Sequence, residues 1–276
     1  MNPDGSRPPR AGRGGRGPAR VIDVLRRTTA TRYVTPLREG GSLPGVVEAA
    51  DLGTYVVKFR GAGQGPKALV AEVVSGELAR RLELPVPELV VMDLDPVVAR
   101  AEPDQEVQEL LKASAGANLG MDFLPGSLGY DPVAHPVAAE LASRVLCFDA
   151  FVENVDRSWR NPNLLIWHGG LWLIDHGATL YFHHNWPRAA AVVHRPYRAD
   201  DHVLGPYATA LPAAGEALSA RLTESGLLTE VLELVPDAWL AEFDFDSPAE
   251  ARAAYVAHLS ARAAEPAAWL PTDTPA

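Results

Sequence analysis

The hydrophobic and polar positions divide the chain into a strand-rich region and a helical region. From residue 21 to about residue 100, short apolar runs alternate with turn signals, a pattern typical of strands. The strands are expected at 46–53, 54–59 and 88–94, and 21–28 fits either a strand or a short helix. In 67–84 the apolar residues recur at helical spacing until Pro85 stops the pattern. We therefore expect a small α+β lobe.

Beyond Pro125 the pattern changes to long helical segments. Helices are expected at 133–154, where Pro136 interrupts the start, and at 208–234 and 247–264. A strand pair is expected at 163–167 and 171–174, joined by a turn at 168–170. The two regions meet near 116–126. We therefore place one lobe at 21–121 and a mostly helical lobe at 122–276.

The first twenty residues are mainly glycine, proline and arginine. Such a segment cannot bury enough apolar surface to offset its ordering entropy, so we expect residues 1–20 to form a disordered tail. The segment holds five arginines and one aspartate. It could contact an acidic partner, although a solvated leader is the favoured interpretation.

Charge and cysteine content exclude several classes of protein. The net formal charge of −10 argues against a general nucleic-acid binder, because phosphate neutralisation needs a basic face. A single cysteine, Cys147, excludes an internal disulfide and a cysteine-based zinc site, and it is interpreted as a small buried hydrophobe. We find no apolar stretch of membrane-spanning length and no signal-peptide core, so a cytoplasmic location without membrane contact is expected.

Candidate chemistry concentrates in the stretch 154-NVDRSWRNPNLLIWHGGLWLIDHGATL-180. Asp156 lies five residues before Asn161, and the predicted hairpin then leads to Asp175, with Gly177 two residues later. Magnesium prefers oxygen ligands, and this order is the layout of the protein-kinase site. A capped helix end would also give the Asp–Asn spacing alone. The I-D-x-G after the hairpin makes the kinase interpretation more specific.

The first lobe supplies the lysine and glutamate that such a site needs. Lys58 interrupts the apolar run 54–59 in a chain with three lysines and 22 arginines, and a compact ammonium there can reach nucleotide phosphates. Glu72 follows on the predicted helix and is expected to pair with Lys58. Glu77 is the rival on a different helical face. Asp156, Lys58 and Glu72 are therefore the candidate catalytic residues.

The order of these residues resembles the HipA-like kinases from about residue 35 to residue 185, and more distantly the phosphatidylinositol-kinase-type catalytic loops. The segment 71-AEVVSGELARRLELPVPE-88 also looks like a segment of that family. The resemblance implies a two-lobed kinase fold with a β-rich N-lobe, one main helix and a helical C-lobe. It makes Asp156 the catalytic base, Asn161 and Asp175 the magnesium ligands and Lys58 the phosphate lysine. The implied adenine hinge comprises Met121, Asp122 and Phe123.

Two departures from the kinase pattern limit what is carried over. Ser158 stands where many protein kinases have a lysine, so we expect Arg157 or Arg160 to supply the positive charge. The chain is also shorter than the toxin-type members of that family, so their substrate and antitoxin partner are not carried over.

Two glycine-rich stretches compete for the phosphates. Gly40, Gly41 and Ser42 precede the strand that leads toward Lys58, where a kinase has its phosphate loop. Ser42 could accept a phosphoryl group, although a turn residue is favoured. The stretch 61-GAGQG-65 superficially suits a dinucleotide site, but no βαβ series follows it, so we interpret it as a mobile strand-to-helix connection. Lys67 beyond it is expected to be solvated, with a nucleotide contact as the alternative.

Five histidines fall between residues 176 and 202, with spacings that fit no standard zinc pattern. They are His176, His183, His184, His194 and His202. We expect a loop-rich, activation-type segment.

The hypothesis from sequence is an ATP- and magnesium-dependent phosphotransferase that acts on a protein Ser or Thr hydroxyl. Three rivals stay open: a pseudokinase that binds nucleotide or serves as a scaffold, a small-molecule kinase acting on an alcohol or sugar, and, weakest, a dinucleotide oxidoreductase. ATP and an unknown hydroxyl acceptor are the expected partners, and no nucleic acid is expected.

Overall fold

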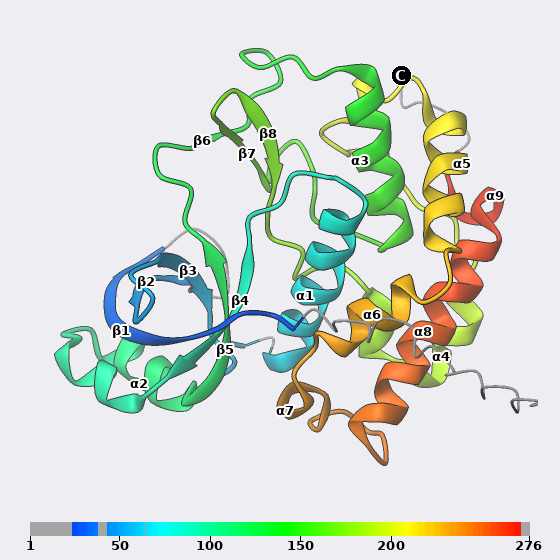
Figure 1. Cartoon of the computed structure of the whole chain (residues 1–276). Coiled ribbons are helices and arrows are strands. Elements are labelled where there is room, and N and C mark those ends of the chain that lie inside the picture. Colours follow the sequence, from blue (N-terminus) through cyan, green and yellow to red (C-terminus); the bar gives the residue numbers. More distant parts are fainter. Residues whose placement is uncertain (1–23, 38–42, 64, 272–276) are drawn as a thin grey trace, which may run out of the picture.

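The computed structural model describes residues 24–37, 43–63 and 65–271 and has two lobes (Figure 1). The N-terminal lobe is a closed barrel with strand order β1–β2–β3–β5–β4. Its strands are β1 (Arg27–Pro36), β2 (Gly45–Ala49), β3 (Thr54–Lys58), β4 (Leu89–Leu94) and β5 (Gly116–Asp122). Neighbouring strands are antiparallel except β1 and β4, which are parallel. The predicted strands at 46–53, 54–59 and 88–94 are confirmed.

Alternation along β3 sets which side chains reach the cleft between the lobes. Tyr55 and Val57 are buried in the barrel, while Val56 and Lys58 lie on the other face and line that cleft. Successive side chains of a strand point to opposite faces, so this separation follows from the period of two. The same run therefore supplies barrel core and a candidate functional lysine.

Helix α1 (Gly65–Arg81) is buried nearly throughout its length, from Leu69 to Ala79. A helix buried on all sides must pair its polar side chains, since an unpaired buried charge is costly. Its end agrees with the predicted stop. Glu83 takes a left-handed conformation (φ 59°), Leu84 N–H donates to Ala79 O at 2.9 Å, and Pro85 follows. Pro85 lacks a backbone donor and cannot continue the helix.

The C-terminal lobe is mostly helical and carries a small sheet of strand order β6–β7–β8. Its helices are α3 (Ala139–Phe151), α4 (Trp186–Val192), α5 (Leu211–Leu222), α6 (Leu227–Glu233), α7 (Asp237–Leu240), α8 (Pro248–Ala264) and α9 (Pro266–Trp269). Its strands are β6 (Leu128–Gly129), β7 (Leu164–Trp167) and β8 (Gly170–Leu173). The predicted hairpin is β7–β8, and the predicted helix 247–264 is α8.

Two helix boundaries differ from the prediction, and several helices were missed. The helix expected from residue 133 begins only at Ala139, because Asp131 Oδ1 accepts from Val133 N–H (2.8 Å) and holds a turn. The segment 208–234 divides at Gly226, whose φ is 92°. Helix α2 (Gln105–Ala113), capped by Asp104, was not predicted, and neither were the short helices α4, α7 and α9.

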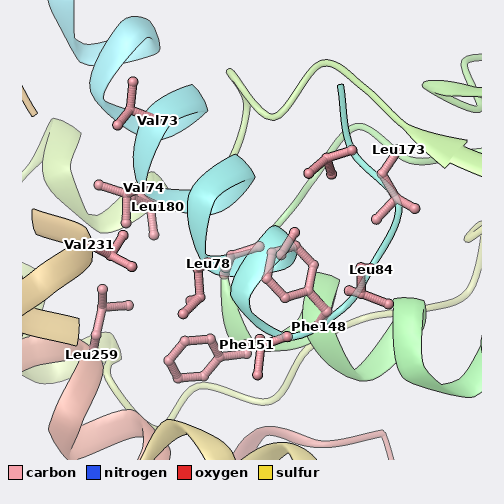
Figure 2. Packing of buried hydrophobic residues seen from close by; sticks show 14 of the residues in the cluster. Val73, Val74, Leu78, Leu84, Phe148, Phe151, Leu173, Leu180, Val231 and Leu259 are labelled. Carbon is pink, nitrogen blue, oxygen red and sulfur yellow. The ribbon is translucent and has the colours of Figure 1, made fainter. Parts of the chain in front are cut away.

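The main hydrophobic core joins α1 to the C-terminal lobe. Val74 and Leu78 of α1 lie in one cluster with Phe151 of α3, Val231 of α6 and Leu259 of α8 (Figure 2). A second, smaller cluster fills the barrel. Helix α1 therefore follows the barrel in sequence but packs as part of the helical lobe.

Cys147 is buried in α3, as predicted, and burial raises the pKa of its thiol to about 12. A thiol with so high a pKa is a poor nucleophile. Within the ranges that the structure describes, we find no helix with both the length and the apolarity needed to cross a bilayer.

Candidate active site

A cleft of about 1000 Å³ opens where the barrel meets the helical lobe. Lys58 and Met121 line it from the barrel, and Asn161 and Asp175 line it from the helical lobe. The apolar part of the lining includes Val56, Leu119, Leu164 and Ile174. A cleft with apolar walls and a few convergent polar groups is the usual form of a small-molecule site.

The structure brings Lys58, Glu72 and Asp175 together at the inner end of this cleft. Lys58 Nζ donates to Glu72 Oε1, and it also donates to Asp175 Oδ1 at 2.5 Å. Glu72 is fully buried on α1, whereas the Asp175 side chain is 44% exposed. Glu77, the rival for Lys58, pairs with Arg80 instead. One ammonium thus lies between two carboxylates from different elements.

Burial and charge together fix the ionisation of this group. Burial acts to lower the pKa of Lys58, but the Glu72 and Asp175 charges outweigh it and raise that pKa above its ordinary value. Burial acts to raise the pKa of Asp175, and the Lys58 charge outweighs it, so that pKa is lowered. Burial keeps the pKa of Glu72 raised. Lys58 is therefore cationic and Asp175 anionic at neutral pH.

The backbone after β8 is shaped to admit these three side chains. Asp175 has a left-handed conformation (φ 53°), and His176 N–H donates to Glu72 Oε2 at 3.0 Å. A Cβ at Gly177 would lie 3.2 Å from Glu72 Oε1 and 3.5 Å from Lys58 Nζ. Glycine is thus needed for close approach, which explains the glycine of the I-D-x-G pattern.

His176 is neutral in this setting. Its ring is buried against the edge of Phe148, with ring centres 6.1 Å apart, and burial lowers its pKa to about 3. It lies beside the carboxylates as a packing group without adding charge to the cleft.

Asp156 is held by amide side chains of its own loop. Its Oδ2 accepts from Asn161 Nδ2 at 2.9 Å and from Asn163 Nδ2 at 3.3 Å, and its N–H donates to Asn154 Oδ1 at 3.0 Å. Both cleft-side amides use Oδ2, which leaves Oδ1 to receive a hydroxyl proton. Asp156 and Asn161 are thus hydrogen-bonded to each other within one loop.

Asn163 was missed by the sequence analysis. Its Nδ2 also donates to Asp156 O at 2.6 Å, its φ is 48°, and it lines the cleft beside Asn161. Asparagine tolerates this conformation better than most residues. The repeated amide in 161-NPN-163, just before a strand, was the signal available in the sequence.

A buried ion pair between Asp149 and Arg157 packs against the loop that carries Asp156. Asp149 of α3 accepts from Asn154 Nδ2 (2.8 Å), Arg157 Nε (2.6 Å) and His202 Nε2 (3.1 Å). Arg157 Nη1 in turn donates to Asn163 O at 2.5 Å. Burial acts to raise the pKa of Asp149, but the Arg157 charge outweighs it and holds that pKa well below its usual range.

The expectation that Arg157 or Arg160 supplies positive charge at the phosphates is wrong for this arrangement. Arg157 is only 2% exposed and is committed to Asp149 and Asn163. Arg160 stacks on the exposed Trp159 with its guanidinium 4.6 Å from the ring centre. Among the described residues that line the cleft, Lys58 is the one cation.

The expected hinge residues Met121, Asp122 and Phe123 all line the cleft at the end of β5. Asp122 N–H donates to Glu88 O and Phe123 N–H to Thr54 O, at 2.9 and 3.0 Å, so this segment is fixed on both sides. Gly40, Gly41 and Ser42 lie outside the described residues.

Leu37 and Pro44, on either side of that glycine-rich segment, line the cleft, and Leu37 N–H donates to Pro44 O at 2.7 Å. The second glycine-rich stretch lies elsewhere. Gly61 N–H donates to Ser114 Oγ next to α2 at 3.1 Å. Lys67 is half-buried and does not line the cleft: its Nζ donates to His183 O at 3.0 Å and lies 5.6 Å from the centre of the Phe243 ring.

Asn161 and Asp175 fit a magnesium site. Asn161 uses its Nδ2 on Asp156, which leaves its Oδ1 free to bind a cation, and the partly exposed Asp175 carboxylate lines the same cleft. Carboxylate and amide oxygens are ligands that magnesium accepts, and magnesium commonly takes its remaining ligands from water and nucleotide phosphates.

The five histidines of 176–202 do not gather at one point. His183 and His184 contact each other (3.3 Å), His202 contacts Asp149, and His194 lies 3.7 Å from Glu265. Within the described ranges no three or more His, Cys, Asp and Glu side chains cluster as a metal site would require.

The comparisons with known proteins agree with this geometry. The model of the HipA-like kinase family matches residues 31–271. The chain belongs to the HipA-like kinase family. This HipA-like kinase is also similar in structure to the Helicobacter pylori proinflammatory kinase CtkA, with a TM-score of 0.54 and 11% identity over 84% of this chain and 92% of that one. The predicted two-lobed kinase fold is therefore confirmed.

A second structural match is the Golgi casein kinase with Mn/ADP bound, at a TM-score of 0.46 and 11% identity over 87% of this chain and 72% of that chain. No match was found among curated proteins. The family match and the fold support a kinase, a phosphotransferase.

Proposed function

We propose that this HipA-like kinase transfers the γ-phosphoryl group of ATP to a Ser or Thr hydroxyl of a protein, in the presence of magnesium. The observation that carries the proposal is the group formed by Lys58, Glu72 and Asp175 at the inner end of the cleft, across from the loop that holds Asp156. Phosphoryl transfer needs little beyond positioning and charge neutralisation, which such groups supply.

Each side chain has a definite role in this proposal. Lys58, oriented by Glu72, binds the nucleotide phosphates, and Asp156 accepts the proton of the acceptor hydroxyl through Oδ1. The acceptor oxygen forms a bond to the γ-phosphorus as the bond from that phosphorus to the β-phosphate oxygen breaks, and ADP leaves. Magnesium held by Asp175 and Asn161 would offset the negative charge of the phosphates.

The protein acceptor rests on family resemblance and on the openness of the loop around Asp156. Val155 and Trp159 flank this aspartate and are 62% and 63% exposed. Exposed apolar side chains beside the base offer a polypeptide a contact surface, whereas kinases of small alcohols must enclose their acceptor to position it.

The proposal is tested by incubating the purified protein with labelled ATP and magnesium, with and without cell lysate, and by measuring melting temperature with Mg-ATP and with NAD. We expect label on protein, a thermal shift with Mg-ATP and none with NAD. Binding without transfer to any acceptor supports the pseudokinase. Label on a small molecule supports an alcohol or sugar kinase, and a shift with NAD alone supports a dinucleotide site.

A further inference from the structure

The sequence around the catalytic loop is basic in an otherwise acidic protein. Residues 157–198 hold five arginines and one acidic residue, Asp175, whereas the whole chain has a net charge of −10. Charge of one sign concentrated beside a site attracts ligands of the other sign. The location of these arginines therefore bears on the acceptor.

Three of these arginines line a hollow beside the loop that carries Asp156. The hollow, of about 330 Å³, lies between residues 153–157 and the segment 195–202, and its lining includes Val155, Arg195 and Arg198. Tyr197 Oη donates to Asn154 O (2.7 Å) and Val203 N–H to Arg157 O (3.1 Å), so the two walls are hydrogen-bonded to each other. These two hydrogen bonds fix the shape of the hollow beside the loop that carries Asp156.

The hollow contains a hydrogen-bond donor, on Arg157, that has no partner among the described residues. Arg157 also lines it, and Arg157 Nη2 is buried with no hydrogen-bond partner among the described residues, although Nε and Nη1 are both engaged. A buried donor without a partner is costly, so such a group is commonly satisfied by water or a ligand. An anion is the ligand that satisfies a guanidinium best.

Arg195 and Arg198 can turn toward such an anion. Arg198 is 88% exposed and pairs with Asp200 at the surface, and the Arg195 contact with Glu153 Oε1 is long, at 3.5 Å. Exposed pairs of this kind contribute little free energy, so their rearrangement is cheap. Glu153 and Asp201 also line the hollow, and burial raises the pKa of Glu153. Arg262 also lines the hollow, so four arginines against two carboxylates leave the lining net basic.

We propose that this hollow is an acceptor subsite for an anionic group, a carboxylate or a phosphate, that lies close in sequence to the hydroxyl that is phosphorylated. This inference rests on the proposed protein-kinase function and names its substrate class: polypeptides with an acidic or already phosphorylated residue near the target. On one side of Asp156, Asn161 and Asn163 line the cleft proposed for the nucleotide. On the other side, Asn154 and Val155 line the hollow. Nucleotide and anionic group thus approach the base from different sides.

The test uses neutral peptides with a single serine, in which one glutamine at a time is replaced by glutamate or by phosphothreonine. We expect one position at which the replacement raises kcat/KM by on the order of tenfold over glutamine. In Arg198→Ala and in the double variant Arg195→Ala/Arg198→Ala the ratio of acidic to neutral peptide should fall toward one. Arg188→Ala, an exposed arginine of α4 outside the hollow, should keep it.

The Mg-ATP thermal shift of each variant serves as the folding control. Comparison of the glutamate and phosphothreonine series identifies the source of the anion. Equal rates on acidic and neutral peptides overturn the proposed subsite but not the proposed kinase function. A preference for acidic peptides that persists in the double variant also overturns the subsite. If no peptide accepts phosphate, the protein-acceptor function fails, and anisotropy with labelled glutamate and glutamine peptides decides the subsite. Tighter glutamate binding that needs both arginines supports it, and equal binding overturns it.

Discussion

Asp156 and Asp175 are both carboxylates of the candidate site, but their neighbours differ. Asp156 is bound by amides and leaves one oxygen for a substrate hydroxyl, whereas Asp175 is bound by Lys58 beside the proposed metal position. The same functional group therefore has two separable roles, and substitution can distinguish them.

Asp156→Asn should retain the thermal shift with Mg-ATP and lose phosphoryl transfer by roughly 10² or more, the lower end for a positioned base. Asp175→Asn should lose both the shift and transfer, because the metal-nucleotide complex loses a ligand. Melting curves and labelled-ATP assays measure the two effects, with exposed Asp244→Asn as the control. Wild-type turnover by Asp156→Asn would remove the catalytic assignment.

Gly177→Ala tests the close approach at the inner end of the cleft. The new Cβ would crowd Glu72 Oε1 at 3.2 Å, so the Lys58–Glu72 pair must shift by a few tenths of an ångström. We expect transfer to fall roughly tenfold or more, with a smaller Mg-ATP shift, since phosphate positioning depends on this pair. Gly63→Ala, where a Cβ meets nothing within 4 Å, is the matched control. Equal activities of the two variants would contradict this account.

At the scale of elements, α1 is joined to the helical lobe as firmly as to the barrel. Arg81 pairs with Glu230 at 3.0 Å, Lys67 donates to His183 O, and Arg60 of the barrel side pairs with Glu242 at 2.5 Å. Trp239 of α7 is fully buried and donates to Ala117 O of β5 at 3.0 Å. These contacts join α1 and the barrel to the helical lobe.

Trp239→Phe keeps an aromatic ring but removes the indole donor. We expect a loss of about 1–3 kcal/mol in the free energy of unfolding, because Ala117 O is left buried without its partner. Urea unfolding measures the change. Trp159→Phe, at an exposed position, should be within about 0.5 kcal/mol of wild type. A similar small change for both would show that the indole bond does not stabilise the lobe contact.

Sequence patterns predicted the elements whose periodicity is regular and missed features set by contacts between distant segments. Strands β2 to β4, the β7–β8 hairpin and α1 follow from apolar spacing and from Pro85. The burial of Arg157 could not be read from its position, because its partner Asp149 lies on α3, and residues around Asp156 were expected to serve the phosphates. Asn163 was visible only as a second amide, and its bond to Asp156 depends on a left-handed backbone.

At the scale of the whole molecule, stability should depend on acid through buried histidine. His183 lies between α1 and α8: its main-chain oxygen binds Lys67, and its Nδ1 and Tyr255 Oη are 2.8 Å apart. Burial lowers its pKa from 6.5 to about 3. Below pH 6.5 the unfolded chain binds a proton at His183, whereas the folded protein does not until the pH approaches 3. The contribution of neutral His183 to the free energy of unfolding is therefore complete above pH 6.5 and declines as the pH falls toward 3.

Between pH 6.5 and pH 3 the expected loss from this one group is about 1.4 kcal/mol of unfolding free energy per pH unit. Urea unfolding at pH 7.5 and 5.5 measures it. His183→Asn should be less stable at pH 7.5 yet lose about 1.4 kcal/mol less than wild type between the two pH values. His194→Asn, at a partly exposed side chain, should keep the wild-type slope. An unchanged slope in His183→Asn would show that other groups control the acid response.

Helix α1 carries Glu72 yet belongs to the core of the helical lobe, and this limits how the Lys58–Glu72 pair can be regulated. The Lys58–Glu72 contact is formed from a helix that packs in the same core as α3, α6 and α8. A helix embedded in a core cannot move outward to break the Lys58–Glu72 contact without partial unfolding. We therefore expect the Lys58–Glu72 contact to be constitutive and control to act on the amount of the protein and on its access to acceptors.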